Sequence, residues 1–176
     1  MRALKITGII LIVVLSVGML AACTLSNDKN ESAGDADLSD MVGRLCEDVD
    51  VPNYEILTLD ENTFENYTFI PYEDGLTAVS ADALVNITPH SLVVIHSDQG
   101  EASTFAEEIY QNADPNKWLC VGSERLCVAN TDHYIVLVMS EEDICDDIID
   151  NFKDIAESLG DGDIELMTAD NSIRYS

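Results

Sequence analysis

Two runs of consecutive apolar residues constrain the fold most strongly. They are "SLVVIHS" at 91–97 and "HYIVLVMS" at 133–140. Each run is short, contains β-branched residues and is bounded by turn-forming residues, which favours a strand over a helix. Because the apolar residues do not alternate with polar ones, we expect both strands to be buried on both faces and to lie at the centre of a sheet.

Apolar residues recur at helical spacing in three other segments. The first covers 38–49, where Asp37 is the expected N-cap and Pro52 ends the helix. The second covers 102–110, and the third runs from 141 to 159 with acids in its first turn and Gly160 as the expected C-cap. These segments predict an N-terminal, a middle and a C-terminal helix, each with one buried face.

Strand-like segments fill most of the remaining chain. They are "YEILTLD" at 54–60, "NYTFIPY" at 66–72, "LTAVSADALV" at 76–85, "WLCV" at 118–121 and "LCVA" at 126–129. Hairpin connections outnumber crossover helices, so the predicted fold class is α+β with a mainly antiparallel sheet. We expect one domain over 38–160, followed by an acidic C-terminal tail over 161–176 with room for a short strand at Ile164–Met167.

The N-terminal segment has the three parts of a secretory signal. Arg2 and Lys5 supply the positive charge, residues 6–20 are almost wholly apolar, and small residues follow at Ala21 and Ala22. The apolar stretch is shorter than the roughly 20 residues that a helix needs to span a bilayer. The sequence therefore predicts a signal peptide over 1–22.

The segment Leu20-Ala21-Ala22-Cys23 resembles the lipobox of bacterial lipoproteins. The resemblance implies that Cys23 receives a diacylglycerol on its sulfur and becomes the first residue after cleavage. Two acyl chains give a stable membrane anchor, whereas one holds a protein only marginally. The expected location is the extracytoplasmic face of the cell membrane, with residues 23–37 as a lipidated, flexible and acidic tether.

The charge balance excludes one class of partner. The chain has 34 acids against 8 bases, a formal net charge of −26, and the predicted leader carries two of those bases and no acid. Phosphate backbones would repel such a surface, so nucleic acid is excluded as a partner. The expected partners are membrane lipid through the acyl chains on Cys23 and, for the domain, an envelope protein or a cationic ligand; a solvated surface with no specific partner is the alternative.

Four cysteines remain besides Cys23. If residues 122–125 form a hairpin loop, Cys120 faces Cys127 and the two can form a disulfide; the alternative is a pair of free thiols. Cys46 and Cys145 fall on the apolar faces of their helices and are expected to be core residues.

The sequence contains no constellation that would carry catalysis or hold a cofactor or metal. His90, His96 and His133 are scattered and form no zinc-binding spacing with each other or with cysteine. The segment Asp161–Asp170 begins like a calcium-binding loop but has Leu166 where the loop needs glycine and Ser172 where it needs glutamate. We therefore expect no catalytic, cofactor-binding or metal residues.

The order of elements resembles that of small lipoproteins of Firmicutes-type bacteria that carry a domain of unknown function. The matching features are the opening helix, "HSLVVIHS" before an acidic helix, the turn containing Trp118, and "HYIVLVMS" before the last helix. The resemblance supports the fold class and supplies no catalytic residues. The functional expectation is a non-enzymatic binding or interaction module; the alternatives are a small extracytoplasmic enzyme and a cation-binding surface protein.

Overall fold

A computed structural model describes residues 33–85, 87–118 and 120–171 of the chain. The predicted leader, Cys23 and the tether up to residue 32 lie outside the described residues. Within the described ranges, no helix combines the length and apolar character needed to cross a membrane.

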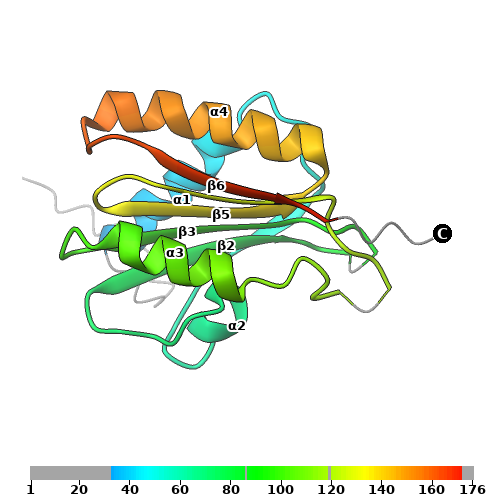
Figure 1. Ribbon diagram of the computed structural model, residues 1–176, viewed down its shortest axis with the longest axis horizontal. Helices are drawn as coiled ribbons and strands as arrows, with labels where there is room; N and C mark the ends of the chain where they lie inside the picture. The colour runs from blue at the N-terminus through cyan, green and yellow to red at the C-terminus, as the bar shows by residue number, and fades with distance from the viewer. Residues whose placement is uncertain (1–32, 86, 119, 172–176) are drawn as a thin grey trace, which may run out of the picture. The chain divides into compact units, whose positions relative to one another are not determined.

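The described residues form one six-stranded antiparallel sheet, with strands in the spatial order β1-β2-β3-β5-β4-β6 (Figure 1). The central strands β3 and β5 are the two apolar runs, which confirms that prediction, and β1 and β6 are the edges. The bounds are β1 Tyr54–Thr58, β2 Leu76–Ala83, β3 Ser91–Ser97, β4 Arg125–Asn130, β5 Tyr134–Ser140 and β6 Glu165–Asp170.

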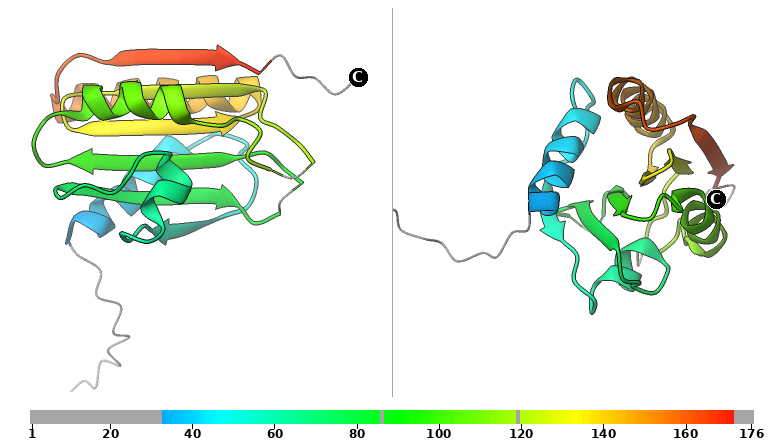
Figure 2. Two further views of the ribbon diagram at one scale, coloured as in Figure 1. Left: turned by 60° about the horizontal axis from the view of Figure 1, so that its bottom comes forward. Right: turned by 90° about the vertical axis from the view of Figure 1, so that its left-hand side faces the viewer.

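Helices cover both faces of the sheet (Figure 2). α1 (Ala33–Leu45) and α4 (Glu142–Leu159) pack on one face, and the short α2 (Phe64–Thr68) packs with α3 (Ala102–Asn112) on the other. Successive residues of a strand point to opposite faces, so Val94 joins the core under α1 and α4 while Val93 joins the core under α2 and α3. The α+β class with N-terminal, middle and C-terminal helices is confirmed.

Two boundaries differ from the sequence prediction. α1 begins at Ala33, within the segment predicted as tether, so Asp37 lies inside the helix instead of capping it. Its first residues are small or acidic, so they do not show the helical spacing of large apolar residues that marks the rest of the helix. At the other end, β6 extends to Asp170 and pairs along its whole length with β4, so the predicted tail contributes an edge strand to the sheet.

Two predicted strands do not form. In the segment 66–72, Thr68 ends α2, and its hydroxyl bonds the carbonyl oxygens of Phe64 and Ile70. The aromatic residues there point into the core from a helix and a loop. The described residues of 118–121 contain no strand either, because β5 and β6 occupy both edges of β4 and leave no position beside it.

Candidate functional site: an acid-rimmed groove between α3 and β6

The groove begins with the way α3 lies on the sheet. Ala102, Ala106 and Ile109 are the buried face of the helix, and they pack on β4 and β5. Ser103 and Glu107 are four residues apart and so lie on one side of the helix, outside the core. Because α3 rests on strands further inside the sheet, the edge strand β6 extends beyond it.

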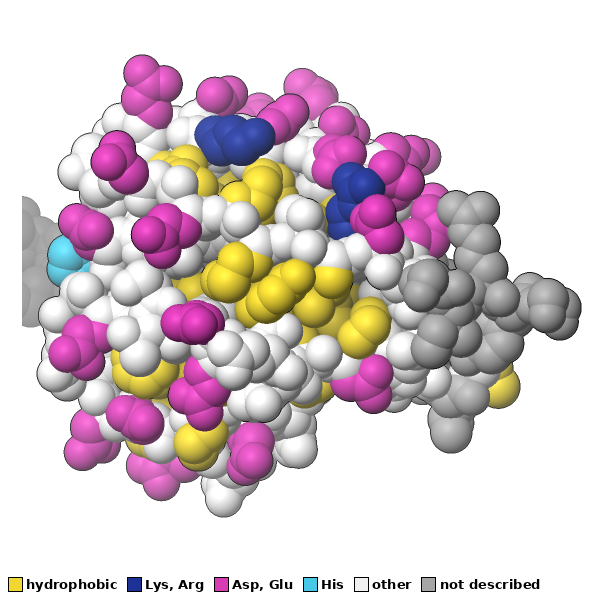
Figure 3. All heavy atoms as spheres, viewed as in Figure 1, with side chains coloured by type: hydrophobic (Ala, Val, Ile, Leu, Met, Phe, Trp, Pro, Cys, Tyr) yellow, Lys and Arg dark blue, Asp and Glu magenta, His cyan; other side chains and the backbone are white. Residues whose placement is uncertain are grey.

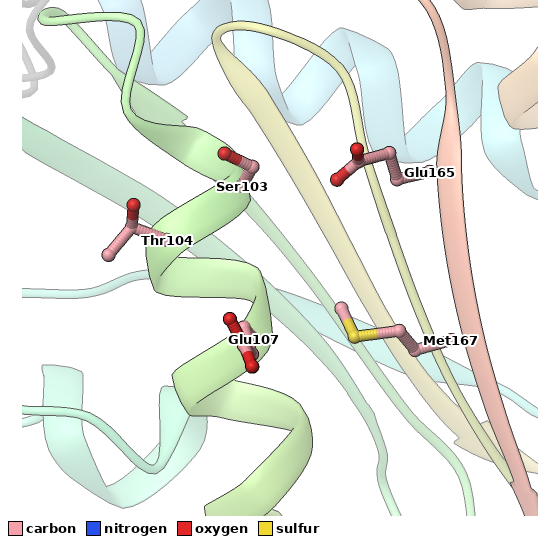
Figure 4. A pocket seen from close by; sticks show the side chains of 5 residues that line it. All are labelled: Ser103, Thr104, Glu107, Glu165 and Met167. Atoms are coloured by element: carbon pink, nitrogen blue, oxygen red, sulfur yellow. The ribbon is translucent and has the colours of Figure 1, made fainter.

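β6 forms the opposite wall. In an antiparallel sheet its alternate residues face the same side, and Met167 packs against the core beneath α3. Glu165, two residues earlier, faces that side as well. In Figure 4, the Glu165 carboxylate and the Met167 side chain both extend from β6 toward α3, where Ser103 and Glu107 lie.

Two adjoining hollows make up the groove, and they share Ser103 and Glu165. The first has a volume of about 370 Å³ and is lined by Ser103, Thr104, Glu107, Glu165 and Met167. The second, at the N-terminal end of α3, has a volume of about 350 Å³ and is lined by Gly100, Ser103, Asn130, Thr131, Asp132, Gly162, Asp163 and Glu165. We refer to these residues together as the acidic groove.

The acidic groove carries carboxylates without a cationic partner. Glu107, Asp132, Asp163 and Glu165 line it, and among the described residues no lysine or arginine does. In the described part of the chain, none of these four forms an ion pair. Figure 3 shows apolar side chains at the surface on both sides of β6 with Asp and Glu side chains around them, and Met167 supplies an apolar side chain to the lining of the groove.

One end of the acidic groove is closed by hydrogen bonds to Asp161. The Asp161 carboxylate accepts from the Thr131 hydroxyl at 2.6 Å and from the His133 backbone N–H at 2.9 Å, and it contacts the His133 ring nitrogen at 2.6 Å. Burial on its own would raise the Asp161 pKa, but these hydrogen bonds together hold it below the usual range. The contacts fix the segment after α4 to the turn between β4 and β5.

Gly162 is required at this end by its backbone and its neighbour. Its φ is +85°, and a Cβ there would lie 2.7 Å from the Asp132 carboxylate. An L-residue would be strained by that φ and would displace an acid that lines the groove.

The far end of the groove is tied by Tyr110. Its hydroxyl donates to the Thr168 carbonyl oxygen at 2.8 Å and so joins the last turns of α3 to β6. Tyr110 therefore ties α3 to β6 at this end, and at the other end Asp161 ties the segment before β6 to the β4–β5 turn.

The opposite face of β6 is held by Arg125. Its guanidinium donates to Asp170 at 2.8 Å, to Asp146 at 2.7 Å and to Glu142 at 2.6 Å, which raises the Arg125 pKa. One side chain thus joins β4, β6 and α4. Lys153 is similarly paired with Asp150 at 2.7 Å.

A second polar cluster lies under α2 at the opposite end of the sheet. The Lys117 ammonium donates to Asp82 at 3.0 Å and to the Ser91 hydroxyl at 2.8 Å, and Ser91 donates to Asp82 at 2.6 Å. The ammonium also lies over the rings of Tyr67 and Trp118, 5.7 Å and 5.1 Å from their centroids. The neighbouring serine and lysine have the residue types of a hydrolytic dyad.

The geometry of that cluster opposes hydrolytic chemistry. Ser91 is fully buried, and its proton is donated to Asp82. The Lys117 ammonium is held by the same carboxylate and by the Ser91 hydroxyl. The cluster therefore satisfies its own polar groups and connects the loop at 117 to β2 and β3.

His90 is buried beside this cluster. It is wholly inaccessible, its Nδ1 lies 3.0 Å from the Ser140 hydroxyl, and its Nε2 has no hydrogen-bond partner among the described residues. Burial lowers its pKa to about 4, with smaller opposing effects from Asp82 and Lys117. His90 is thus a neutral core residue at physiological pH.

The other two histidines lie at the opposite end of β3 and β5. The rings of His96 and His133 are stacked with centroids 6.2 Å apart, and His96 contacts Asp98 at 3.3 Å. Across the described ranges, no group of three or more His, Cys, Asp or Glu residues is placed to hold a metal ion.

The candidate pair Cys120 and Cys127 lies in two different environments. Cys120 is exposed in a loop, Cys127 is buried on β4, and the structure has both as free thiols. The hairpin that would have paired them does not form, because β5 and β6 are the partners of β4. Cys145 is a core residue as expected, and Cys46, just after α1, is partly buried against the same core.

Sequence reasoning did not find the acidic groove. Its acids come from α3, the β4–β5 turn and the segment from Gly162 to β6, which are far apart in the chain. In a sequence so rich in acid, none of them forms a local motif. The one usable signal was the short strand at 164–167, whose alternation places Glu165 and Met167 on one face.

The chain matches no family model, and neither a curated protein nor a solved structure shows significant similarity to it.

Proposed function

We propose that the chain is a lipid-anchored, extracytoplasmic binding module without enzymatic activity, and that its acidic groove takes a positively charged segment of another envelope protein. The anchor part of the proposal is supported by the lipobox-like sequence ending at Cys23. The binding part is supported by the geometry of α3 and β6.

One observation carries the binding proposal. Four carboxylates line a groove to which the described residues contribute no positive side chain, in a chain whose net charge is −26. Elsewhere, Lys117, Arg125 and Lys153 are all paired with acids. Carboxylates grouped in this way repel each other, and a cation between them would remove that repulsion.

The shape of the groove favours a peptide segment over a single ion. Its two hollows adjoin and are walled by a helix and a strand, with Met167 as an apolar contact. A lysine-containing segment could place its ammonium groups near Glu107 and Glu165 and an apolar side chain on Met167.

The non-enzymatic part of the proposal is supported by the state of the polar groups away from the groove. Ser91, His90 and Ser140 are buried and inaccessible to a substrate, and Lys117 is held by Asp82. The exposed groove contains Ser103 and Thr104, and its described lining includes neither a histidine nor a lysine beside these hydroxyls.

Peptide binding to paired variants tests the binding proposal. The full chain, extracted from membranes in non-ionic detergent, is titrated with a labelled peptide of alternating lysine and leucine in about 0.15 M salt. Glu107→Gln with Glu165→Gln removes two groove carboxylates. At about 0.5–1 kcal/mol each, their loss weakens binding by about 5- to 30-fold.

The matched control removes the same charge elsewhere. Glu61→Gln with Glu157→Gln changes two exposed glutamates outside the groove and is expected to alter the affinity less than about twofold. Equal weakening by both double variants would mean that the peptide responds to net charge alone, and the groove would lose its role.

A further inference from the structure

Two cysteines from distant parts of the chain meet between the sheet and α4. Cys127 lies in the middle of β4, and Cys145 lies in the first turns of α4. Both belong to the same apolar core, with exposed fractions of 1% and 0%. No sequence pattern links them, because one follows a strand period and the other a helix period.

The two thiols are in contact. A hydrogen bond joins Cys145 to Cys127, and the Cys145 sulfur also lies 3.7 Å from the Arg125 carbonyl oxygen, two residues before Cys127. This hydrogen bond lowers the pKa of Cys127 and raises the pKa of Cys145, so in the folded core the shared proton stays on Cys145.

We propose that Cys127 and Cys145 form a disulfide bond in the mature protein and so attach α4 to the sheet. The proposal rests on the extracytoplasmic location proposed above, where disulfides form and persist. Two side chains already in sulfur contact need only small rotations to reach the bonding distance of about 2.05 Å.

The other cysteines of the described domain do not compete for this bond. The Cys46 thiol packs on the α1 side of the same core and hydrogen-bonds Tyr54. Cys120 is exposed in the loop before β4, whereas the Cys127 side chain is enclosed between β4 and α4. Within the native fold, Cys145 is therefore the partner that Cys127 can reach.

The bond forms by thiol–disulfide exchange while the core is still open. The Cys127 thiolate attacks one sulfur of a donor disulfide, such as that of an oxidoreductase or glutathione, and displaces the other sulfur as a thiolate. The Cys145 thiolate then attacks the Cys127 sulfur and releases the rest of the donor. The two cysteines lose two electrons and two protons, and the donor disulfide gains them as two thiols.

Peptide mapping of the full chain tests the proposal. Protein is extracted from membranes with iodoacetamide present, denatured without reductant, and cleaved after acidic residues, which separates Cys127 from Cys145 at Asp132 and Glu141. The expected product is a linked Cys127–Cys145 pair, about 2 Da lighter than the two free peptides, with Cys46 and Cys120 alkylated. Four alkylated cysteines, or a Cys120–Cys127 link, would overturn it.

Variants and refolding separate this proposal from the proposed location. Cys46→Ser with Cys120→Ser should retain the link, and Cys127→Ser should leave Cys145 alkylated. In a second arm, reduced and denatured full chain is refolded in a glutathione redox buffer, where the link is expected wherever the cell places the protein. Fully free thiols in both arms, with Cys23 lipidated, would overturn the disulfide and leave the location intact.

Thermal unfolding gives a further readout of the bond. The link closes a loop from 127 to 145, and chain-entropy arguments for a loop of this length predict that Tm falls by roughly 6–12 °C when the linked protein is unfolded in reductant. The Cys46→Ser, Cys120→Ser protein should show the same fall. An unchanged Tm in linked protein would show that the bond does not hold α4 to the sheet.

Discussion

His90 provides the sharpest test of the folded core. The imidazole is fully buried beside Ser140, and burial lowers its pKa to about 4. In the unfolded chain the pKa of a histidine is about 6.5. Because the folded-state pKa is the lower one, the neutral ring contributes stability that is fully present above about pH 6.5 and is lost as the pH falls toward 4.

The size of the effect follows from the two pKa values. Between pH 8 and pH 5, the linkage relation gives a loss of about 2 kcal/mol in the free energy of unfolding, and the full shift corresponds to about 3 kcal/mol below pH 4. The many surface carboxylates also respond to pH, but they do so in every variant. The comparison of variants therefore isolates His90.

The perturbation is His90→Asn, which keeps a polar group near the Ser140 hydroxyl and removes the titrating ring. The full chain is unfolded in urea at several pH values, and unfolding is followed by the fluorescence of Trp118, the only tryptophan. The asparagine variant is expected to be less stable at pH 8 because of the missing ring volume. Its loss of stability from pH 8 to pH 5 should be about 2 kcal/mol smaller than that of the wild type.

Ser140→Ala serves as the control, since it leaves the imidazole buried. It should be destabilised at every pH and keep the pH dependence of the wild type. If the His90→Asn and wild-type curves run parallel between pH 8 and pH 5, the ring is not held neutral by burial and the reasoning fails.

Three other predictions concern the walls of the groove and the anchor. Arg125→Gln removes the contacts to three exposed carboxylates and should lower the free energy of unfolding by about 1–3 kcal/mol. The difference between wild type and variant should be smaller in 1 M salt. A urea midpoint equal to that of Lys153→Gln would contradict this. Gly162→Ala should destabilise by at least about 1 kcal/mol because φ is +85°, whereas Gly43→Ala, in a helix with open space around it, should stabilise by about 0.5–1 kcal/mol. Cys23→Ala should prevent incorporation of labelled fatty acid and release the protein from washed membranes; retention of the label would exclude Cys23 as the attachment site.

The sequence predicts the central strands of the sheet well because their need for burial outweighs the conformational preferences of single residues. In a strand, the consecutive apolar residues of 91–97 and 133–140 are buried only if both faces of the sheet are covered, and β3 and β5 have that environment. The long helix ending at Gly160 was equally visible, since its buried face and its left-handed C-cap are both local signals.

The sequence predictions that differ from the structure share one physical cause. Which strands pair is decided by residues far apart in the chain. The segment 66–72 has strand-forming residues, yet turn hydrogen bonds from the Thr63 N–H and hydroxyl to the Asp60 carboxylate lead the chain into α2 instead. The predicted Cys120–Cys127 hairpin failed because β5 and β6, both later in the chain, pair with β4. The groove could not be predicted for the same reason, since its position depends on which strand α3 covers.

The structure also shows how the chain accommodates its excess of acids. Lys117 and Arg125 are paired with carboxylates where separate elements meet, and Lys153 is paired with Asp150 within α4. The acids of the groove are left without such a partner within the described residues. This contrast, more than the net charge itself, supports the proposal that a positively charged segment binds between α3 and β6.

Mapping of backbone amide chemical shifts would show directly whether the acidic groove binds a positively charged peptide. The isotope-labelled full chain in detergent micelles is titrated with the alternating lysine–leucine peptide, and amide signals are followed by residue. We predict that the largest shifts cluster on both walls of the acidic groove, at Ser103, Glu107, Glu165 and Met167. Shifts that centre instead on the exposed acids of α4, or that spread evenly over the acidic surface, would contradict it.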